Sequence, residues 1–123
     1  EIEDRFTLFF FFYVQPIDII HSDINILGFK FKNLAYITDA SKIDEKEKKK
    51  LKNLDFFIIN CLRKTEPHHS HFILPQILEL VDELQPKKTY LIHISHHLGF
   101  HDEVENELPD HIHLAYDGLE IEF

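Results

Sequence analysis

The sequence predicts an α/β fold, of the layered α+β type, in which helices pack against a sheet. Two observations indicate this fold class. Short runs of aromatic and β-branched residues, which favour strands, recur along the chain. From residue 44 onward, segments with helical periodicity lie between such runs, and this alternation places helices against a sheet. A length of 123 residues corresponds to one domain or to a piece of one.

The first third of the chain predicts strands. Residues 6–20 are rich in aromatic and β-branched side chains and predict two strand pieces. A bend or a sheet edge is expected at Gln15-Pro16, because proline cannot donate a hydrogen bond to a sheet ladder. Residues 8–12 show no polar alternation, which suggests a strand that is covered on both faces. After a turn, residues 26–32 and 34–38 predict the two strands of a hairpin.

Three helices are predicted after this hairpin. Residues 44–51 predict a charged helix, whose acidic first turn and lysine-rich last turn suit the helix dipole. Residues 73–84 predict an amphipathic helix with Pro75 in its first turn, where proline is tolerated. Residues 102–108 predict a short acidic helix. The apolar stripe of the second helix, which is expected to face the core, consists of Ile77, Leu80, Val81 and Leu84.

Further strands are predicted between and after these helices. Residues 55–59 and 89–92 are apolar segments that are typical of buried strands. Residues 111–116 and 119–123 predict a terminal hairpin, because the Asp-Gly pair between them is a strong turn signal. The strands need burial on both faces, yet only two of the helices are substantial, so the predicted core is incomplete.

Composition and charge exclude several classes of function. A net charge of −9 argues against nucleic-acid binding, which needs a basic surface, and the basic run at residues 46–50 is interpreted as a solvated helix face. The single cysteine, Cys61, excludes an intrachain disulfide and a thiolate-rich zinc site, and it fits a reducing, cytoplasmic compartment. No apolar run reaches the roughly 20 residues of a membrane-spanning helix.

Histidine is unusually abundant, with 10 residues in the chain. His93 and His96 follow one predicted strand, and Asp39 follows another. Imidazole and carboxylate groups at strand ends are well placed to hold a metal ion. Each residue could instead have a structural role that involves no metal. Asp39 would then be a turn or capping residue, and the histidines would cap the next helix. His21, at a further strand end, is either a ligand or a structural histidine.

Four side chains near the predicted second helix could contact a substrate. His71 is a helix cap, an exposed loop residue or a proton carrier with a pKa near neutrality. Arg63 is either a phosphate contact or an ordinary surface arginine. His68 and His69 are interpreted as loop-surface residues, with substrate contact as the alternative.

Three motifs in this order resemble a known family. They are LAYITDA at residues 34–40, LIHISHH at residues 91–97 and AYDGLEI at residues 115–121. Together they resemble the C-terminal half of metallo-β-lactamase-fold hydrolases, and the branch that they resemble most is the phosphoribosyl cyclic phosphodiesterase of phosphonate breakdown. The fold that this resemblance implies is the C-terminal half of an αββα sandwich.

The resemblance also implies roles for particular residues. Asp39 is expected to bridge two metal ions, and His21 and His93 are each expected to bind one ion. His71 matches the catalytic histidine of the family, which does not bind metal and which would hold a phosphoryl oxygen or protonate the leaving group. His96 and Asp117 are expected to lie next to the metal ligands without binding metal themselves, and to orient these neighbours.

The implied function is metal-dependent hydrolysis of a small, cyclic phosphodiester, through a hydroxide shared by two Zn²⁺ or Mn²⁺ ions. The family motif His-x-His-x-Asp-His is absent from the chain. The chain is therefore expected to be the C-terminal part of a longer protein, with a degenerate half-domain as the alternative. Two other functions stay open: a non-catalytic interaction module without metal, and another hydrolase of the superfamily. The expected partners are the substrate and a second copy of the chain.

Overall fold

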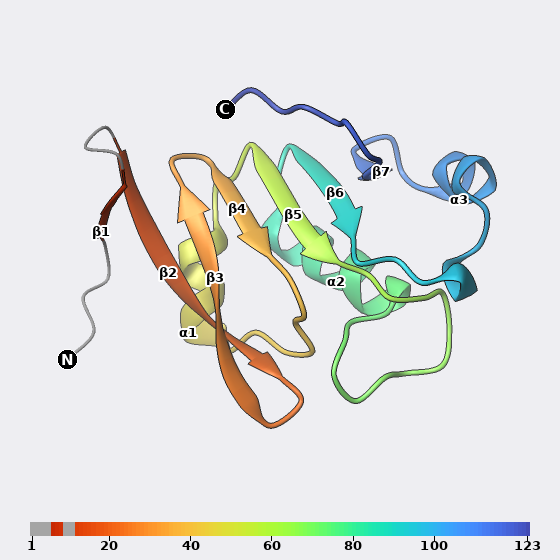
Figure 1. The fold of residues 1–123 in the computed structure, drawn as a ribbon, viewed down its shortest axis with the longest axis horizontal. Coiled ribbons are helices and arrows are strands. Elements are labelled where there is room, and N and C mark those ends of the chain that lie inside the picture. The colour runs from red at the N-terminus through yellow and green to blue at the C-terminus, as the bar shows by residue number, and fades with distance from the viewer. Residues whose placement is uncertain (1–5, 9–11) are drawn as a thin grey trace.

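The centre of the protein is one sheet (Figure 1). A computed structural model describes residues 6–8 and 12–123, with side chains from Tyr13 onward. Within these residues the sheet has seven strands, which lie side by side in the order of the sequence. The strands are β1 (Phe6–Leu8), β2 (Phe12–His21), β3 (Ile24–Phe31), β4 (Leu34–Ile37), β5 (Phe56–Asn60), β6 (Lys88–Ile92) and β7 (Ile112–Leu114). The helices are α1 (Glu45–Lys48), α2 (Leu74–Leu84) and α3 (His101–Glu107), with the 3₁₀ helices η1 (Lys49–Leu51) and η2 (His96–Leu98).

The direction of the strands brings the C-terminal ends of five strands to one edge of the sheet. The pairs from β1 to β4 are antiparallel, whereas those from β4 to β7 are parallel. Parallel neighbours need crossover connections, which contain α1, α2 and α3 in turn. Because β2 and β4 both run opposite to β3, and β5, β6 and β7 run parallel to β4, five strands have their C-terminal ends at the same edge: β2, β4, β5, β6 and β7. Segments that are remote in sequence meet there.

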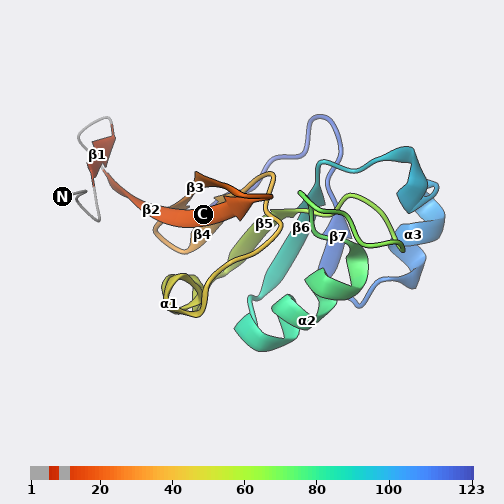
Figure 2. The same ribbon diagram turned by 90° about the horizontal axis from the view of Figure 1, so that it is seen from below.

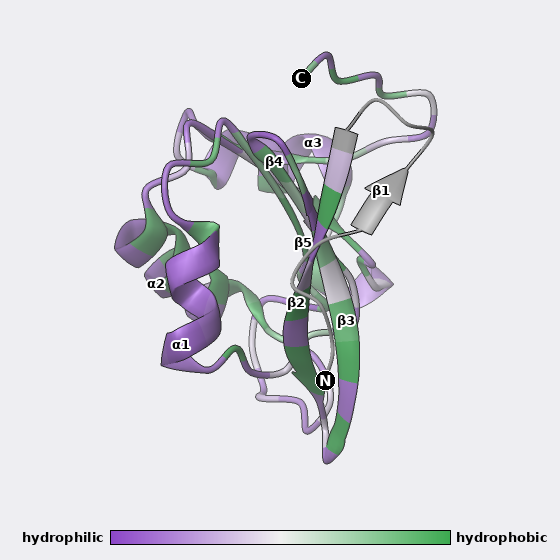
Figure 3. Cartoon of the chain, turned by 90° about the vertical axis from the view of Figure 1, so that its left-hand side faces the viewer, coloured by the Kyte–Doolittle hydropathy of each residue, from purple (hydrophilic) through white to green (hydrophobic). Residues whose placement is uncertain are grey.

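The core lies between the sheet and two helices. Figure 2 shows α1 and α2 on the same face of the sheet, and most of α1 is hydrophilic (Figure 3). The predicted apolar stripe of α2 is buried throughout: Ile77, Leu80, Val81 and Leu84. These side chains belong to one cluster with inward-facing residues of the sheet, which include Ala35, Ile37, Phe57, Ile59 and Leu91. Each buried aliphatic side chain contributes about 1.5–3 kcal/mol, so this interface accounts for much of the stability.

The opposite face of the sheet carries exposed apolar side chains. Gly28 faces the core, since a Cβ atom there would lie 2.8 Å from Cγ1 of Ile37. Alternation along the strands places Leu27 and Tyr36 on the other face, where they are 47% and 42% exposed. The expected burial of this face in a sandwich or a homodimer stays a prediction.

Of the two features predicted at Gln15-Pro16, the bend is absent and the sheet edge is observed. β2 runs without a break from Phe12 to His21, and Pro16 lies opposite Phe29 of β3. In the described residues, β1 pairs with β2 only as far as Val14. Beyond that point β2 has a ladder partner on one side, so the missing N–H of proline costs no hydrogen bond on the other. The predicted strand at residues 8–12 lies mostly outside the described residues.

The predicted terminal hairpin is also wrong. β7 pairs parallel to β6, and residues 119–123 form no strand. A turn does form where it was predicted, with Gly118 at φ +90° and Leu119 N–H donating to Tyr116 O over 3.1 Å. The chain then runs back across the sheet (Figure 1), and the rings of Phe123 and Phe31 come within 6.3 Å. Packing on β3 therefore replaces pairing with β7.

The predicted α/β fold class is confirmed, and the remaining predicted helices and hairpin correspond to observed elements with ends shifted by a few residues. The predicted hairpin of residues 26–32 and 34–38 is the antiparallel pair β3 and β4. Among the described residues, no helix has the length and apolar character that crossing a bilayer requires.

Glu105 ties α3 to β7. One carboxylate oxygen accepts from Leu114 N–H over 2.8 Å, and the other lies 2.6 Å from Nδ1 of His113. Partial burial raises the pKa of Glu105, but the two hydrogen bonds outweigh burial, and the pKa is lowered overall. We expect Glu105→Gln to lower the free energy of unfolding by about 1 kcal/mol at pH 7.

The effect of Glu105→Gln has a defined pH dependence. A carboxyl group with a lowered pKa in the folded state stabilises the fold above its unfolded pKa, near 4.5. This stabilisation is lost as the pH falls through the lower, folded pKa. Urea titrations of both proteins between pH 7 and pH 3 are expected to converge at the acidic end. A difference that stays constant with pH would show that the charge of Glu105 does not matter.

Candidate metal centre

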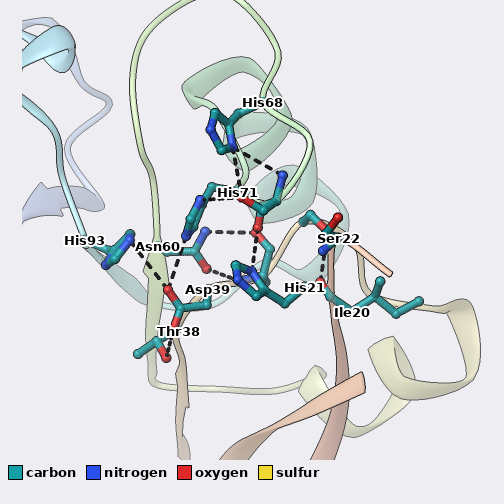
Figure 4. A network of polar contacts seen from close by, with 12 residues as sticks. Ile20, His21, Ser22, Thr38, Asp39, Asn60, His68, His71 and His93 are labelled. Atoms are coloured by element: carbon teal, nitrogen blue, oxygen red, sulfur yellow. Dashed lines mark hydrogen bonds and ion pairs between the residues drawn. The ribbon is translucent and has the colours of Figure 1, made fainter. Parts of the chain in front are cut away.

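Asp39 lies where the chain leaves β4. Its Oδ1 atom is 3.2 Å from Nε2 of His71 and 3.5 Å from Nε2 of His93, and its Oδ2 atom accepts a hydrogen bond from Oγ1 of Thr38 over 3.2 Å. His71 lies just before α2 and His93 just after β6, so three separate segments converge on one carboxylate (Figure 4). The side chain of His71 is 14% exposed, whereas those of Asp39 and His93 are 39% and 46% exposed. The cluster therefore opens to solvent on one side.

Backbone conformation directs two of these side chains. Asp39 has φ +58° and His93 has φ +54°, in the left-handed region that residues with a Cβ atom rarely adopt. This conformation costs roughly 1–2 kcal/mol for such residues, although aspartate tolerates it better than most. His93 directly follows the end of β6, and Asp39 follows the end of β4 after one intervening residue, Thr38; at both places the unusual φ turns the chain sharply. Backbone strain at two residues that lie close together in space is typical of functional sites.

Backbone hydrogen bonds tie the three segments together. Phe72 N–H donates to Ala40 O over 2.8 Å, which joins the residue after His71 to the residue after Asp39. Leu62 N–H donates to Phe72 O, and Ser95 N–H donates to Leu62 O, each over 3.0 Å. This chain of bonds runs from the end of β4 to the loop after β6. The relative positions of Asp39, His71 and His93 are thus determined by main-chain contacts.

Asn60, at the end of β5, fixes the residue after Asp39. Its side chain is fully buried; Oδ1 accepts from Ala40 N–H over 2.7 Å, and Nδ2 donates to Ala40 O over 2.9 Å. We expect Asn60→Ala to lower the free energy of unfolding by about 2–3 kcal/mol, because the buried N–H of Ala40 loses its partner. Urea denaturation measures this loss. Asn106→Ala, on the exposed surface of α3, is the matched control and is expected to stay within about 0.5 kcal/mol.

His21 lies beside the cluster. Its Nδ1 atom donates to Ser70 O over 2.9 Å, so in the neutral ring Nε2 carries the lone pair. The ring of His21 is 5.1 Å from the ring of His71, which in turn stacks on His93 at 4.6 Å. A histidine whose Nδ1 is held by a carbonyl in this way is oriented as metal-binding histidines are.

The electrostatics of the cluster suit a cation. Partial burial raises the pKa of Asp39, but the hydrogen bond from His71 and the charge of His93 outweigh burial, and the pKa is lowered overall. Burial lowers the pKa of His71, and the hydrogen bond to Asp39 offsets this only in part. The site thus favours an anionic Asp39 carboxylate, the protonation state in which this group binds metal.

The donor set and its spacing fit a metal ion. Among the described residues, one group of potential ligands stands together: Asp39, His71 and His93, whose donor atoms lie within 4.8 Å of one another. Zn²⁺ binds imidazole and carboxylate ligands at about 2.0–2.2 Å, and two ligands of a tetrahedral ion are then roughly 3.4 Å apart. The observed separations of 3.2 and 3.5 Å from Asp39 match this value.

The other predicted residues lie outside this group. His96 is exposed on η2, where its ring lies 3.9 Å from that of His97. Asp117 is exposed in the turn after β7 and lines, with His93, a shallow hollow of about 350 Å³. Arg63 donates from Nε to Glu66 O over 2.8 Å and from Nη2 to Pro67 O over 3.3 Å, so its guanidinium group holds the loop before His71.

Sequence reasoning missed Asn60 and Ser70. Asn60 ends a predicted strand at the same edge as Asp39, and a buried amide at that place could have indicated a link between strand ends. Ser70 had no such signal, since it contacts His21, which lies 49 positions away.

Comparisons with known proteins agree with this geometry. A family model described as "Beta-lactamase superfamily domain" matches residues 1–94. An octanoyltransferase from Porphyromonas gingivalis is 38% identical over 107 residues, which cover 87% of this chain and 22% of that protein. The expected resemblance is thereby confirmed at the level of the superfamily.

Two solved structures share the fold. The crystal structure of a new diphosphatase from the PhnP family is 37% identical, with a TM-score of 0.92 over 98% of this chain and 46% of that chain. The metallo-beta-lactamase fold protein YhfI from Bacillus subtilis is 17% identical, with a TM-score of 0.76 over 94% of this chain and 51% of that chain. At that identity YhfI shows the fold alone. The chain spans about half the length of these proteins, or less.

Proposed function

Because the chain belongs to the beta-lactamase superfamily, we propose that it contributes Asp39, His93 and His71 to the active site of a metal-dependent phosphohydrolase. The observation that carries this proposal is the convergence of Asp39, His71 and His93 from three separate segments. The substrate class that we propose is a small phosphodiester, in particular a cyclic one, or a diphosphate. The similarity of the chain to a diphosphatase over 98% of its length supports a phosphorus-containing substrate.

The proposed roles follow from position and chemistry. Asp39, with two carboxylate oxygens that face different neighbours, would bridge two Zn²⁺ or Mn²⁺ ions, and His93 and His21 would each hold one through Nε2. When bound, such ions activate water and neutralise charge on the phosphoryl group. His71 would hold a phosphoryl oxygen or protonate the leaving oxygen through Nε2, which already faces the carboxylate at 3.2 Å.

The family motif His-x-His-x-Asp-His does not occur in these 123 residues. We therefore propose that the remaining ligands come from a segment outside them, and that this segment covers the exposed face of the sheet. The chain covers 46% of the diphosphatase, which supports this division.

Acyl transfer is not carried over from the octanoyltransferase. The chain covers 22% of that protein, and the only cysteine in this sequence is a poor nucleophile. Cys61 is fully buried, and burial raises the pKa of its thiol to about 12.

A direct assay tests the proposal. The full natural protein, loaded with Zn²⁺ or Mn²⁺, is offered bis(4-nitrophenyl) phosphate, a ribose cyclic phosphodiester and a nucleoside diphosphate. We expect hydrolysis of at least one substrate, loss of activity with a chelator and recovery on return of the metal. Metal-loaded protein that hydrolyses none of the three substrates would contradict the proposed function.

A further inference from the structure

Ser70 contacts three histidines with three different polar atoms. Its N–H donates to Nδ1 of His68 over 3.2 Å, and its carbonyl accepts from Nδ1 of His21 over 2.9 Å. Its hydroxyl oxygen lies 3.1 Å from Nδ1 of His68 and 3.0 Å from Nδ1 of His71. Ser70 is 7% exposed, so these contacts are largely shielded from water. Figure 4 shows the three histidines that these contacts join: His21, His68 and His71.

The direction of these hydrogen bonds can be assigned. A backbone N–H can only donate, so Nδ1 of His68 is an acceptor. The Ser70 hydroxyl, which is close to the same nitrogen, must therefore donate its hydrogen to His68. Its oxygen is then left to accept from Nδ1–H of His71. This assignment makes all three contacts of the Ser70 N–H and hydroxyl hydrogen bonds, whereas the reverse direction would set two lone pairs against each other at His68. It places a proton on Nδ1 of His71, so the contact of Nε2 with Asp39 Oδ1 is a further hydrogen bond in the ring that carries both protons, which is also the form that can protonate a leaving oxygen.

We propose that Ser70 is a positioning residue for His71, and that His68 acts on His71 through the Ser70 hydroxyl. With Nδ1 held by Ser70, the ring of His71 is oriented so that Nε2 faces Asp39 and the phosphoryl group of the substrate. His68 holds the hydroxyl in the direction that accepts from His71. The inference rests on the proposed function, because it assigns the support of the group that would contact the phosphate.

Two substitutions at His68 separate the effect of the position of the hydrogen-bond acceptor from the effect of side-chain size. In His68→Asn the side-chain oxygen replaces Nδ1 as an acceptor, whereas in His68→Gln the oxygen reaches the position of Nε2 instead. His69→Asn is the matched control, because His69 stacks on His68 at 4.5 Å but is exposed and lies outside this set of hydrogen bonds. We expect Ser70→Ala and His68→Gln each to lower kcat about tenfold with little change in KM, since one hydrogen bond is lost.

A double variant tests whether His68 acts through Ser70. If it does, Ser70→Ala combined with His68→Gln is no slower than Ser70→Ala alone, because the hydroxyl that carries the coupling is already gone. His68→Asn, Ser70→Thr and His69→Asn are expected to retain near-normal kcat. A second readout needs no substrate: the ¹⁵N resonance of Nδ1 of His71 in the metal-free protein is expected to shift in Ser70→Ala and His68→Gln, but not in His69→Asn.

The outcomes distinguish this inference from the proposed function. If the unaltered protein hydrolyses its substrate while the effects of Ser70→Ala and His68→Gln multiply, the coupling is wrong and the function stands. Equal effects of His68→Gln and His69→Asn on kcat and on the resonance also overturn the inference. If the unaltered protein hydrolyses no phosphodiester or diphosphate, the function and the inference fail together.

Discussion

Asp39→Asn is expected to weaken binding of Zn²⁺ or Mn²⁺ to the purified protein by more than about 100-fold. Changing a residue that only supports a metal ligand lowers metal affinity by at most about 100-fold, and changing a ligand itself is expected to cost more. The amide keeps the shape of the carboxylate but has no negative charge, and one of its two oxygens is lost. Asparagine also tolerates the left-handed backbone at this position, φ +58°, better than alanine does. Elemental analysis and calorimetric titration with the metal measure the loss.

The control for Asp39→Asn is Asp82→Asn. Asp82 is exposed on α2, and the same change there removes one negative charge from the protein without touching the cluster. Metal content is expected to remain normal in this variant. Full metal occupancy in the Asp39 variant would show that the carboxylate does not hold an ion.

His71→Ala is expected to lower turnover by about 10²–10⁴-fold, the range that a positioned acid or base contributes. The metal content should remain normal, because in the proposed arrangement Asp39, His93 and His21 hold the ions. The alternative role of His71 is that of a metal ligand. Its Nε2 atom lies 3.2 Å from Oδ1 of Asp39, whereas Nε2 of His93 lies 3.5 Å from the same atom. Steady-state kinetics and elemental analysis of the same preparation decide between the two roles.

The control for His71→Ala is His69→Ala, two positions earlier on the exposed loop, which is expected to retain its turnover. If His71→Ala loses metal together with activity, His71 is a ligand, and its role as a proton donor is wrong. If its turnover is unchanged, His71 has no part in the chemistry.

The gathering of strand ends at one edge of the sheet could be predicted from sequence, because it depends on the order of strands and helices along the chain. Apolar runs that alternate with helices place the ends of parallel strands together, so Asp39 and His93 were expected near each other. His71 was expected to contribute chemistry, yet its hydrogen bond with Asp39 depends on how the loop folds back before α2. The family membership was predictable from three motifs in their order.

The parts that could not be predicted depend on tertiary contacts. Pro16 predicts a bend or a sheet edge, and the choice between them depends on β1, which in the described residues does not extend alongside Pro16 and leaves it at the edge of an unbroken strand. The terminal segment leaves the Asp-Gly turn to pack on Phe31, since β7 already pairs parallel with β6. The role of Ser70 arises from contacts with residues on both sides of the loop and on β2.

The central claim is that a metal ion binds between Asp39 and His93. Crystals of the full natural protein grown with Zn²⁺ allow the ion to be located by anomalous scattering at the zinc edge. The account predicts a peak about 2.0–2.2 Å from a carboxylate oxygen of Asp39 and from Nε2 of His93. A protein that binds Zn²⁺ elsewhere, with no peak beside Asp39, would contradict it.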